Sequence, residues 1–165
     1  MQPAFELYRL DRELDRASLI DELAAVPARL RAAIAAADPA TLAGSGSGDE
    51  WSPMQVIRHL RDAVQVYGMR FKWMILDDEP LLPNYDENRW AADSPDGPAD
   101  IESVLAAIEA YRAETVRLLR ALPPAGWQRR GNHEALGWLE LGPYVRHELA
   151  HEEQHLAQLQ HALGA

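Results

Sequence analysis

The chain has 165 residues, of which 47% are hydrophobic and 25% are charged, and we expect a single globular domain over residues 1–165. Its 16 basic and 26 acidic side chains give a formal net charge of −10, which disfavours binding to nucleic acid and to anionic membrane surfaces. Because there is no cysteine, the composition excludes disulfides, thiolate nucleophiles and cysteine-ligated zinc. Any bound metal must therefore use imidazole, carboxylate or water as ligands.

A transmembrane helix needs about 20 predominantly apolar residues, and the sequence contains no apolar run of even 18. Its first six residues also lack the basic start and apolar core of a secretory signal. We therefore expect a cytoplasmic protein with no role at membranes.

The segment from residue 18 to residue 37 carries apolar side chains three or four positions apart with charges between them, which predicts an amphipathic helix. Pro27 interrupts this pattern, so a kink or a fresh helical start is expected near Val26. The pair Asp38-Pro39 ends the helix, because a residue that precedes proline avoids helical geometry.

Ser52 carries the signals of a second helix start. Its side chain can cap a helix, Pro53 suits the first helical position, and Gln55 stands where a capping box requires it. From Val56 onward, apolar residues share one helical face until Asp77. The sequence thus predicts a long helix between these points.

Two more helices are expected after a long connection. Residues 79–99 contain several prolines and no helical periodicity, so they predict a crossover that can span a bundle from end to end. A third helix is expected over residues 100–122 and a fourth over residues 139–163, with Pro143 in the first turn of the fourth. No segment predicts a strand. The expected fold class is therefore all-α, a four-helix bundle with the crossover between its second and third helices.

Three histidines repeat every four residues in the last predicted helix, at His147, His151 and His155. Residues four apart are neighbours on a helix, so His151 and His155 can bind one metal ion together. A helical projection places His155 at the border of the apolar face and moves His147 toward solvent. The row thus predicts a two-histidine half of a metal site.

A third ligand is needed to complete such a site, and His59 is the natural candidate. It stands on the shoulder of the apolar stripe of the second predicted helix, and bundles assemble metal sites from inward side chains on facing helices. Three neutral imidazoles with open positions for water or substrate are typical of a catalytic metal site. A packing or hydrogen-bonding role for His59 is the alternative, and it is the commoner role of a single histidine at such a position.

Residues 147–151 also match the H-E-x-x-H motif of zinc proteases, in which two histidines bind zinc and the glutamate acts as base. One extended form of this motif requires glycine and histidine at the positions that Gln154 and Ala157 occupy here. We therefore interpret the match as a coincidence of sequence.

Glu148 and Glu152 lie close to the apolar face of the last predicted helix, where a carboxylate needs a partner. Either one could hydrogen-bond a metal-ligating imidazole or act as general base on a metal-bound water. The alternative is a salt bridge to an arginine such as Arg58 or Arg70.

His133 lies in the turn-rich segment 131–137 ahead of the last helix. A histidine in such a loop can contact substrate, and it can also be a solvated or turn-capping residue. Both interpretations stay open for His133, and the role of His147 stays open as well.

Three features occur together along the chain: Trp51-Ser52-Pro53 leading to His59-Leu60, the proline-rich crossover, and His151 followed by the segment from Gln154 to Gln158. In this combination the chain resembles the DinB-like superfamily of metalloenzymes. The resemblance implies a four-helix bundle of up-down-down-up order and a homodimer. It also implies a divalent metal, namely Zn, Ni, Fe or Mn, held by His59, His151 and His155.

The resemblance further implies an activity. Members of this superfamily include S-transferases that use mycothiol or bacillithiol and a thiol-dependent maleylpyruvate isomerase, and the metal would there bind the thiol cofactor as a thiolate. We therefore expect a metal-dependent enzyme of the thiol S-transferase or hydrolase type that acts on a small molecule, with a low-molecular-weight thiol as a second cofactor. The alternative is a non-catalytic, metal-stabilised bundle that binds ligands or serves in a stress response.

Overall fold

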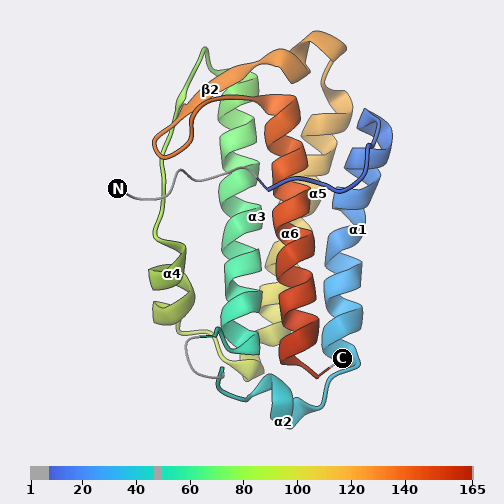
Figure 1. The fold of residues 1–165 in the computed structure, drawn as a ribbon, viewed down its shortest axis with the longest axis vertical. Helices are drawn as coiled ribbons and strands as arrows, with labels where there is room; N and C mark the ends of the chain where they lie inside the picture. The colour runs from blue at the N-terminus through green and yellow to red at the C-terminus, as the bar shows by residue number, and fades with distance from the viewer. Residues whose placement is uncertain (1–7, 47–49, 165) are drawn as a thin grey trace.

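The computed structural model describes residues 8–46 and 50–164, and four long helices dominate it (Figure 1). They lie side by side along the long axis of the molecule: α1 (Arg16–Ala35), α3 (Pro53–Leu76), α5 (Ile101–Ala121) and α6 (Leu141–Ala162). Helices α1 and α6 run in one direction, and α3 and α5 run in the other, which is the up-down-down-up order. The predicted all-α four-helix bundle is confirmed. None of the helices in the described ranges combines the length and apolarity needed to span a bilayer.

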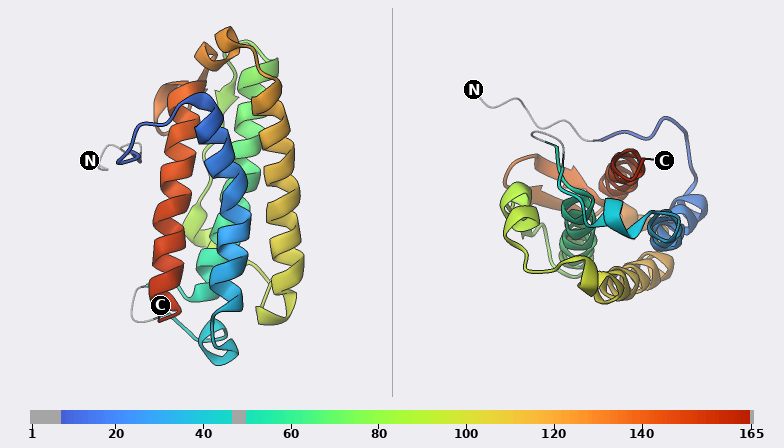
Figure 2. Two further views of the ribbon diagram at one scale, coloured as in Figure 1. Left: turned by 90° about the vertical axis from the view of Figure 1, so that its right-hand side faces the viewer. Right: turned by 90° about the horizontal axis from the view of Figure 1, so that it is seen from below.

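The segment between α3 and α5 runs the length of the bundle, as predicted, because α3 ends at one end of the molecule and α5 begins at the other (Figure 2). This crossover contains β1 (Leu81–Leu82), α4 (Glu87–Asp93) and a 3-10 turn (Pro98–Asp100). Two further short elements complete the other connections, namely α2 (Pro39–Leu42) after α1 and a 3-10 turn (Pro124–Gln128) after α5.

The expectation that the chain forms no strand is wrong. Strand β1 pairs in parallel with β2 (Arg130–His133), and β2 pairs antiparallel with β3 (Gly137–Glu140), so β2 is the central strand of a small sheet. The register places Leu82 opposite His133 and thereby ties the crossover to the segment ahead of α6. Strands of two to four residues are too short to show a period-two pattern in the sequence.

Two predicted helix boundaries also need correction. The last helix begins at Leu141 and not at Leu139, because Leu139 lies in β3 and pairs with Gly131. Helix α1 continues through Pro27, so of the two alternatives expected near Val26, a kink or a fresh start, the fresh start is wrong. Pro27 is itself buried, and packing of this face holds the helix together across the missing backbone hydrogen bond.

The start of α3 forms as the sequence predicts. Ser52 Oγ accepts a hydrogen bond from the Gln55 backbone N–H at 3.2 Å, and Gln55 Oε1 accepts one from the Ser52 backbone N–H at 2.9 Å. This reciprocal pair is the capping box. It fixes where α3 begins, about two turns before the buried His59.

Two clusters of buried apolar side chains fill the interior. One includes Leu23 of α1, Phe71 of α3 and Leu149 of α6, and the other includes Ile57 of α3 and Leu159 of α6. Helices α3 and α6 contribute to both clusters, so their facing sides are buried along most of their length. Polar groups on these faces must find partners inside the protein.

Arg112 on α5 is a charge buried in this interior. It is 2% exposed, and its Nη2 donates to Glu148 Oε1 at 3.0 Å and also to Glu152 Oε1. Both carboxylates are fully buried. The predicted salt bridge of these glutamates therefore forms, but its partner is neither Arg58 nor Arg70. Helices α5 and α6 lie diagonally across the bundle (Figure 2), so the two glutamates point into its centre, which Arg112 reaches from the opposite side.

We predict that Arg112→Met lowers the free energy of unfolding by about 3–5 kcal/mol, because it leaves two buried carboxylates without a counter-charge. Urea denaturation at neutral pH measures the change. The matched control is Arg120→Met, which removes an exposed ion pair with Asp21 at 2.8 Å and should cost no more than about 1 kcal/mol. Equal losses in the two variants would contradict the special role of the buried charge.

Candidate metal centre

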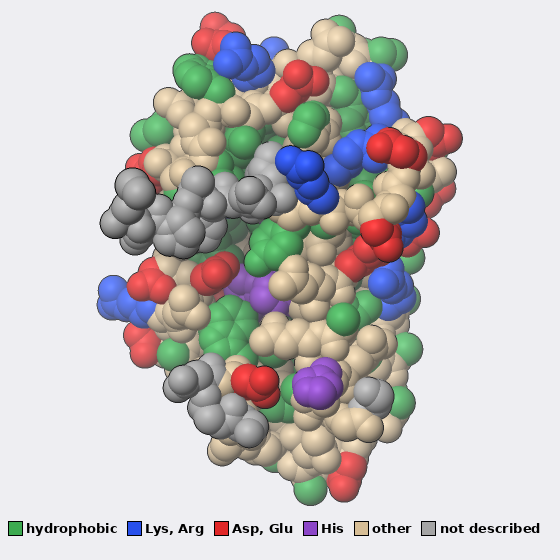
Figure 3. Space-filling view, viewed as in Figure 1, with side chains coloured by type: hydrophobic (Ala, Val, Ile, Leu, Met, Phe, Trp, Pro, Cys, Tyr) green, Lys and Arg blue, Asp and Glu red, His purple; other side chains and the backbone are tan. Residues whose placement is uncertain are grey.

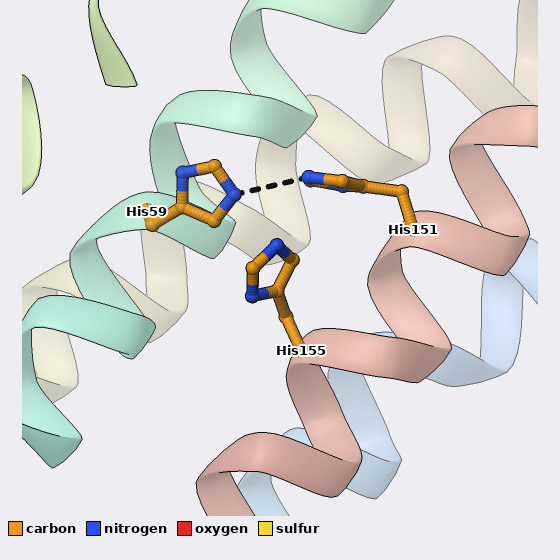
Figure 4. Close-up of side chains that lie close together, drawn as sticks. All are labelled: His59, His151 and His155. Atoms are coloured by element: carbon orange, nitrogen blue, oxygen red, sulfur yellow. Dashed lines mark hydrogen bonds between the residues drawn. The ribbon is translucent and has the colours of Figure 1, made fainter. Parts of the chain in front are cut away.

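The facing sides of α3 and α6 bring three histidines together, as Figure 4 shows. His59 comes from α3, and His151 and His155 come from successive turns of α6. One ligand atom from each ring lies within 4.8 Å of the others, and the Nε2 atoms of His59 and His151 are 3.1 Å apart. The structure thus assembles the three residues that the sequence singled out as ligands.

Burial keeps these imidazoles neutral. Burial, with a smaller contribution from the charge of His155, lowers the pKa of His59 to about 3. Burial and the three neighbouring histidines lower the pKa of His151 to about 2, and burial also lowers the pKa of His155. A neutral imidazole has a free lone pair, which is the form that binds a metal ion.

The spacing of His59 and His151 fits two ligands of one divalent cation. Two imidazole nitrogens that are each about 2.0–2.1 Å from one cation lie about 2.9–3.4 Å apart at the angles of tetrahedral and octahedral sites. The observed 3.1 Å between Nε2 of His59 and Nε2 of His151 falls within that range. His155 Nδ1 lies 2.8 Å from Gln158 Oε1 and donates to it, so its Nε2 is left free, and Figure 4 shows this atom turned toward the other two rings.

Aromatic rings flank the three histidines. The Trp51 ring centroid lies 4.9 Å from that of His59 and 5.8 Å from that of His155, with the latter pair stacked. The Tyr8 ring centroid lies 5.1 Å from that of His151. His155 is partly exposed, and Figure 3 shows histidine surface in a hollow between hydrophobic side chains on the face formed by α3 and α6. A small molecule can therefore approach the cluster from this side.

His147 does not point toward solvent, contrary to the helical projection. It is 5% exposed, its Nδ1 accepts a hydrogen bond from the Tyr8 backbone N–H at 2.7 Å, and its Nε2 lies 2.8 Å from Tyr67 Oη. The segment ahead of α1 covers this side of α6, and a projection of one helix cannot include such a cover. His147 lies one turn beyond His151 and outside the three-histidine group.

Glu148 and Glu152, the candidate base or hydrogen-bond partners of the ligands, face Arg112. The Nδ1 atoms of His59 and His151 are buried and have no hydrogen-bond partner among the described residues. The two glutamates therefore do not orient the histidines in this structure. Their side chains stabilise the bundle through Arg112.

His133 lies in β2 and is 4% exposed, so the solvated interpretation is wrong. Its Nδ1 accepts hydrogen bonds from the backbone N–H groups of Ala135 at 3.1 Å and Leu136 at 3.3 Å, which confirms the turn-capping interpretation. Burial, followed by the positive charge of Arg70, lowers the pKa of His133 to about 4. The ring centroid of His133 lies 6.2 Å from that of Tyr144, which accepts a hydrogen bond from Arg70.

The chain is similar to known proteins over most of its length. The family model described as the DinB superfamily matches residues 22–159. A relative from Oceanobacillus iheyensis is 30% identical over 140 residues, which cover 85% of this chain and 81% of the relative. YfiT of Bacillus subtilis is 29% identical over 150 residues, which cover 88% of this chain and 84% of YfiT. The names of both relatives describe candidate metal-dependent hydrolases.

A solved structure has the same fold. The structure of YfiT from Bacillus subtilis superimposes with a TM-score of 0.83 at 24% identity and covers 94% of this chain and 91% of its own. It is described as a probable metal-dependent hydrolase with an unusual four-helix bundle topology.

We predict that the wild-type chain retains about one equivalent of divalent metal after desalting and that His155→Ala loses most of it, because two imidazoles bind more weakly than three. Elemental analysis measures the metal, and thermal melting with and without added metal measures the coupled stabilisation. His161→Ala is the control, since it removes an exposed imidazole from the same helix. The ligand assignment fails if His155→Ala and wild type carry the same amount of metal.

Proposed function

The chain belongs to the DinB superfamily, and from this premise we propose that it is a divalent-metal-dependent hydrolase that acts on a small molecule. The observation that carries the proposal is the group of three neutral imidazoles, two of them 3.1 Å apart at Nε2, at a place where one ring reaches the surface. A closed structural site would use four protein ligands, whereas three leave positions for water and substrate. The names of the relatives support hydrolysis as the reaction class.

The residues have separate tasks in this proposal. The Nε2 atoms of His59, His151 and His155 would hold the cation, which supplies Lewis-acid activation of a water or of a substrate oxygen when bound. Gln158 holds His155 in the tautomer that leaves Nε2 free. The rings of Trp51 and Tyr8 limit the access of water at the sides of the cluster.

A thiol S-transferase uses the same kind of metal site with a different second reactant. Since this chain has no cysteine, the sulfur would arrive with a low-molecular-weight thiol. We place hydrolysis first because the relatives' names point to it, and a thiol-dependent reaction is a distinct outcome of the test below. A cytoplasmic location and a homodimer remain predictions from the sequence.

We predict thiol-independent turnover of at least one member of a panel of activated carboxylic esters, amides and phosphate esters. A chelator should abolish turnover, a divalent metal should restore it, and His151→Ala should lower kcat/KM at least about a hundredfold. His161→Ala is again the matched control.

Three other outcomes of this assay would contradict the hydrolase proposal. If product forms from an electrophile only when a thiol is added, the activity is that of an S-transferase and not of a hydrolase. Turnover that survives both the chelator and His151→Ala would reject a metal-dependent enzyme. Metal binding without any turnover would favour the non-catalytic bundle.

A further inference from the structure

A second polar cluster lies next to the three histidines, with Arg70 at its centre. Arg70 on α3 is 3% exposed. Its Nη1 donates to Tyr144 Oη at 2.9 Å, its Nη2 donates to the backbone carbonyl of Pro83, and its Nε has no hydrogen-bond partner among the described residues. No carboxylate of residues 8–46 and 50–164 forms an ion pair with it.

An uncompensated buried charge is costly, so its environment calls for an explanation. Arg112, which is also buried, has two carboxylates within reach of one nitrogen. The chain has 26 acidic side chains for 16 basic ones, and a shortage of carboxylates is therefore not the cause. The positive charge of Arg70 is instead available to a group that is not an acidic side chain of the described residues.

The hydrogen bonds of His147 determine whether the Tyr67 hydroxyl donates or accepts. Because His147 Nδ1 accepts from the Tyr8 backbone N–H, the neutral ring carries its proton on Nε2. That proton is donated to Tyr67 Oη at 2.8 Å. The hydroxyl proton of Tyr67 is then free, and none of the hydrogen bonds in the described part of the chain uses it.

His133 and Tyr144 also keep protons that they can donate. His133 Nδ1 accepts two backbone N–H groups, so the neutral ring carries its proton on Nε2, where it can be donated. Tyr144 Oη accepts from Arg70 and keeps its own hydroxyl proton for another acceptor. The cluster thus presents unused donors on four residues, namely Arg70 with its Nε, Tyr67, Tyr144 and His133, together with one positive charge.

Donors and a positive charge without an acceptor are complementary to an oxyanion. We propose that this cluster binds a carboxylate or phosphate group and that, building on the proposed function, the substrate is a small molecule with such a group beside the bond to be cleaved. The rings of Tyr67 and His151 are 5.7 Å apart between centroids, and Arg70 Cζ lies 5.8 Å from the Tyr67 ring. Tyr67 therefore lies between Arg70 and His151 of the three-histidine group.

The cluster lies close to the surface on the crossover side. Arg70 Cζ is 5.9 Å from the ring of Tyr85, which is partly exposed and lies between β1 and α4. Residues of the crossover rather than a bundle helix thus stand between Arg70 and solvent on this side.

The test is a calorimetric titration of the full chain, as purified and with its metal content measured, with inorganic phosphate, acetate and the uncharged acetamide. We expect phosphate or acetate to bind and acetamide not to bind, and the preferred anion identifies the substrate's charged group. Arg70→Gln should weaken binding at least about tenfold. Arg120→Gln removes the same charge from the surface and should change binding less than about twofold.

Tyr67→Phe keeps the ring and removes one donor, so it should weaken binding about fivefold and decides the case if Arg70→Gln does not fold. The proposal is overturned if neither anion binds the wild-type chain, or if the folded Arg70→Gln or Tyr67→Phe variant binds as the wild type does. The same titration of His155→Ala separates the two proposals. Binding retained there supports the anion site whatever the fate of the hydrolase, and binding lost there would place the anion on the metal instead.

Discussion

The packing of α3 against α6 is the constraint on which both polar sites depend. The two helices run antiparallel. Each one has, on the side that faces the other, a row of side chains about one or two helical turns apart. On α6 the row is His147, His151 and His155, and on α3 it includes His59 and Tyr67, which are eight residues apart. Because a single contact face carries both rows, the three-histidine group and the Arg70 cluster lie end to end along one seam of the bundle.

Burial in this seam selects the protonation state of each group. Imidazoles lose their proton at ordinary pH when they are taken out of water, so the histidines act as lone-pair donors or as oriented hydrogen-bonding groups. A guanidinium cannot be deprotonated in the same way and keeps its charge. Two arginines are buried among the residues that the structure describes. Arg112 is neutralised by two carboxylates, whereas Arg70 donates to a tyrosine hydroxyl and a backbone carbonyl.

Much of this arrangement follows from local sequence patterns. Ser52, Pro53 and Gln55 interact within one turn, so the capping box and the start of α3 could be predicted without knowing the fold. The four-residue spacing of His151 and His155 likewise placed them on one side of a helix. Bringing His59 to them required the bundle as a further assumption, together with a resemblance to known proteins.

The errors arose where distant segments decide the environment of a residue. His147 is buried by backbone that precedes α1, and the glutamates pair with an arginine on the diagonally opposite helix, neither of which a single-helix projection contains. Strand β1 is held by pairing with a segment about fifty residues away, and β2 pairs locally with β3. All three strands are only two to four residues long and leave little trace in the sequence. Arg70 looked like any helix arginine, because its lack of a carboxylate partner is a property of its surroundings and not of its neighbours in sequence.

The pairing of β1 with β2 has a consequence for how such a protein can diversify. The crossover is attached to the bundle by the pairing of β1 with β2, by burial of Leu82 in the core, and by hydrogen bonds from the arginines of α3 to Pro83, Ala91 and Asp96. The three histidines lie on helices whose positions are set by the core. Replacement of residues around Pro83 and Tyr85 would change what surrounds Arg70 without moving His59, His151 or His155. The donor residues of the Arg70 cluster lie on α3, α6 and β2, so changes in the crossover would alter only the side of that cluster that Pro83 and Tyr85 form, while the three histidines keep the positions that α3 and α6 give them.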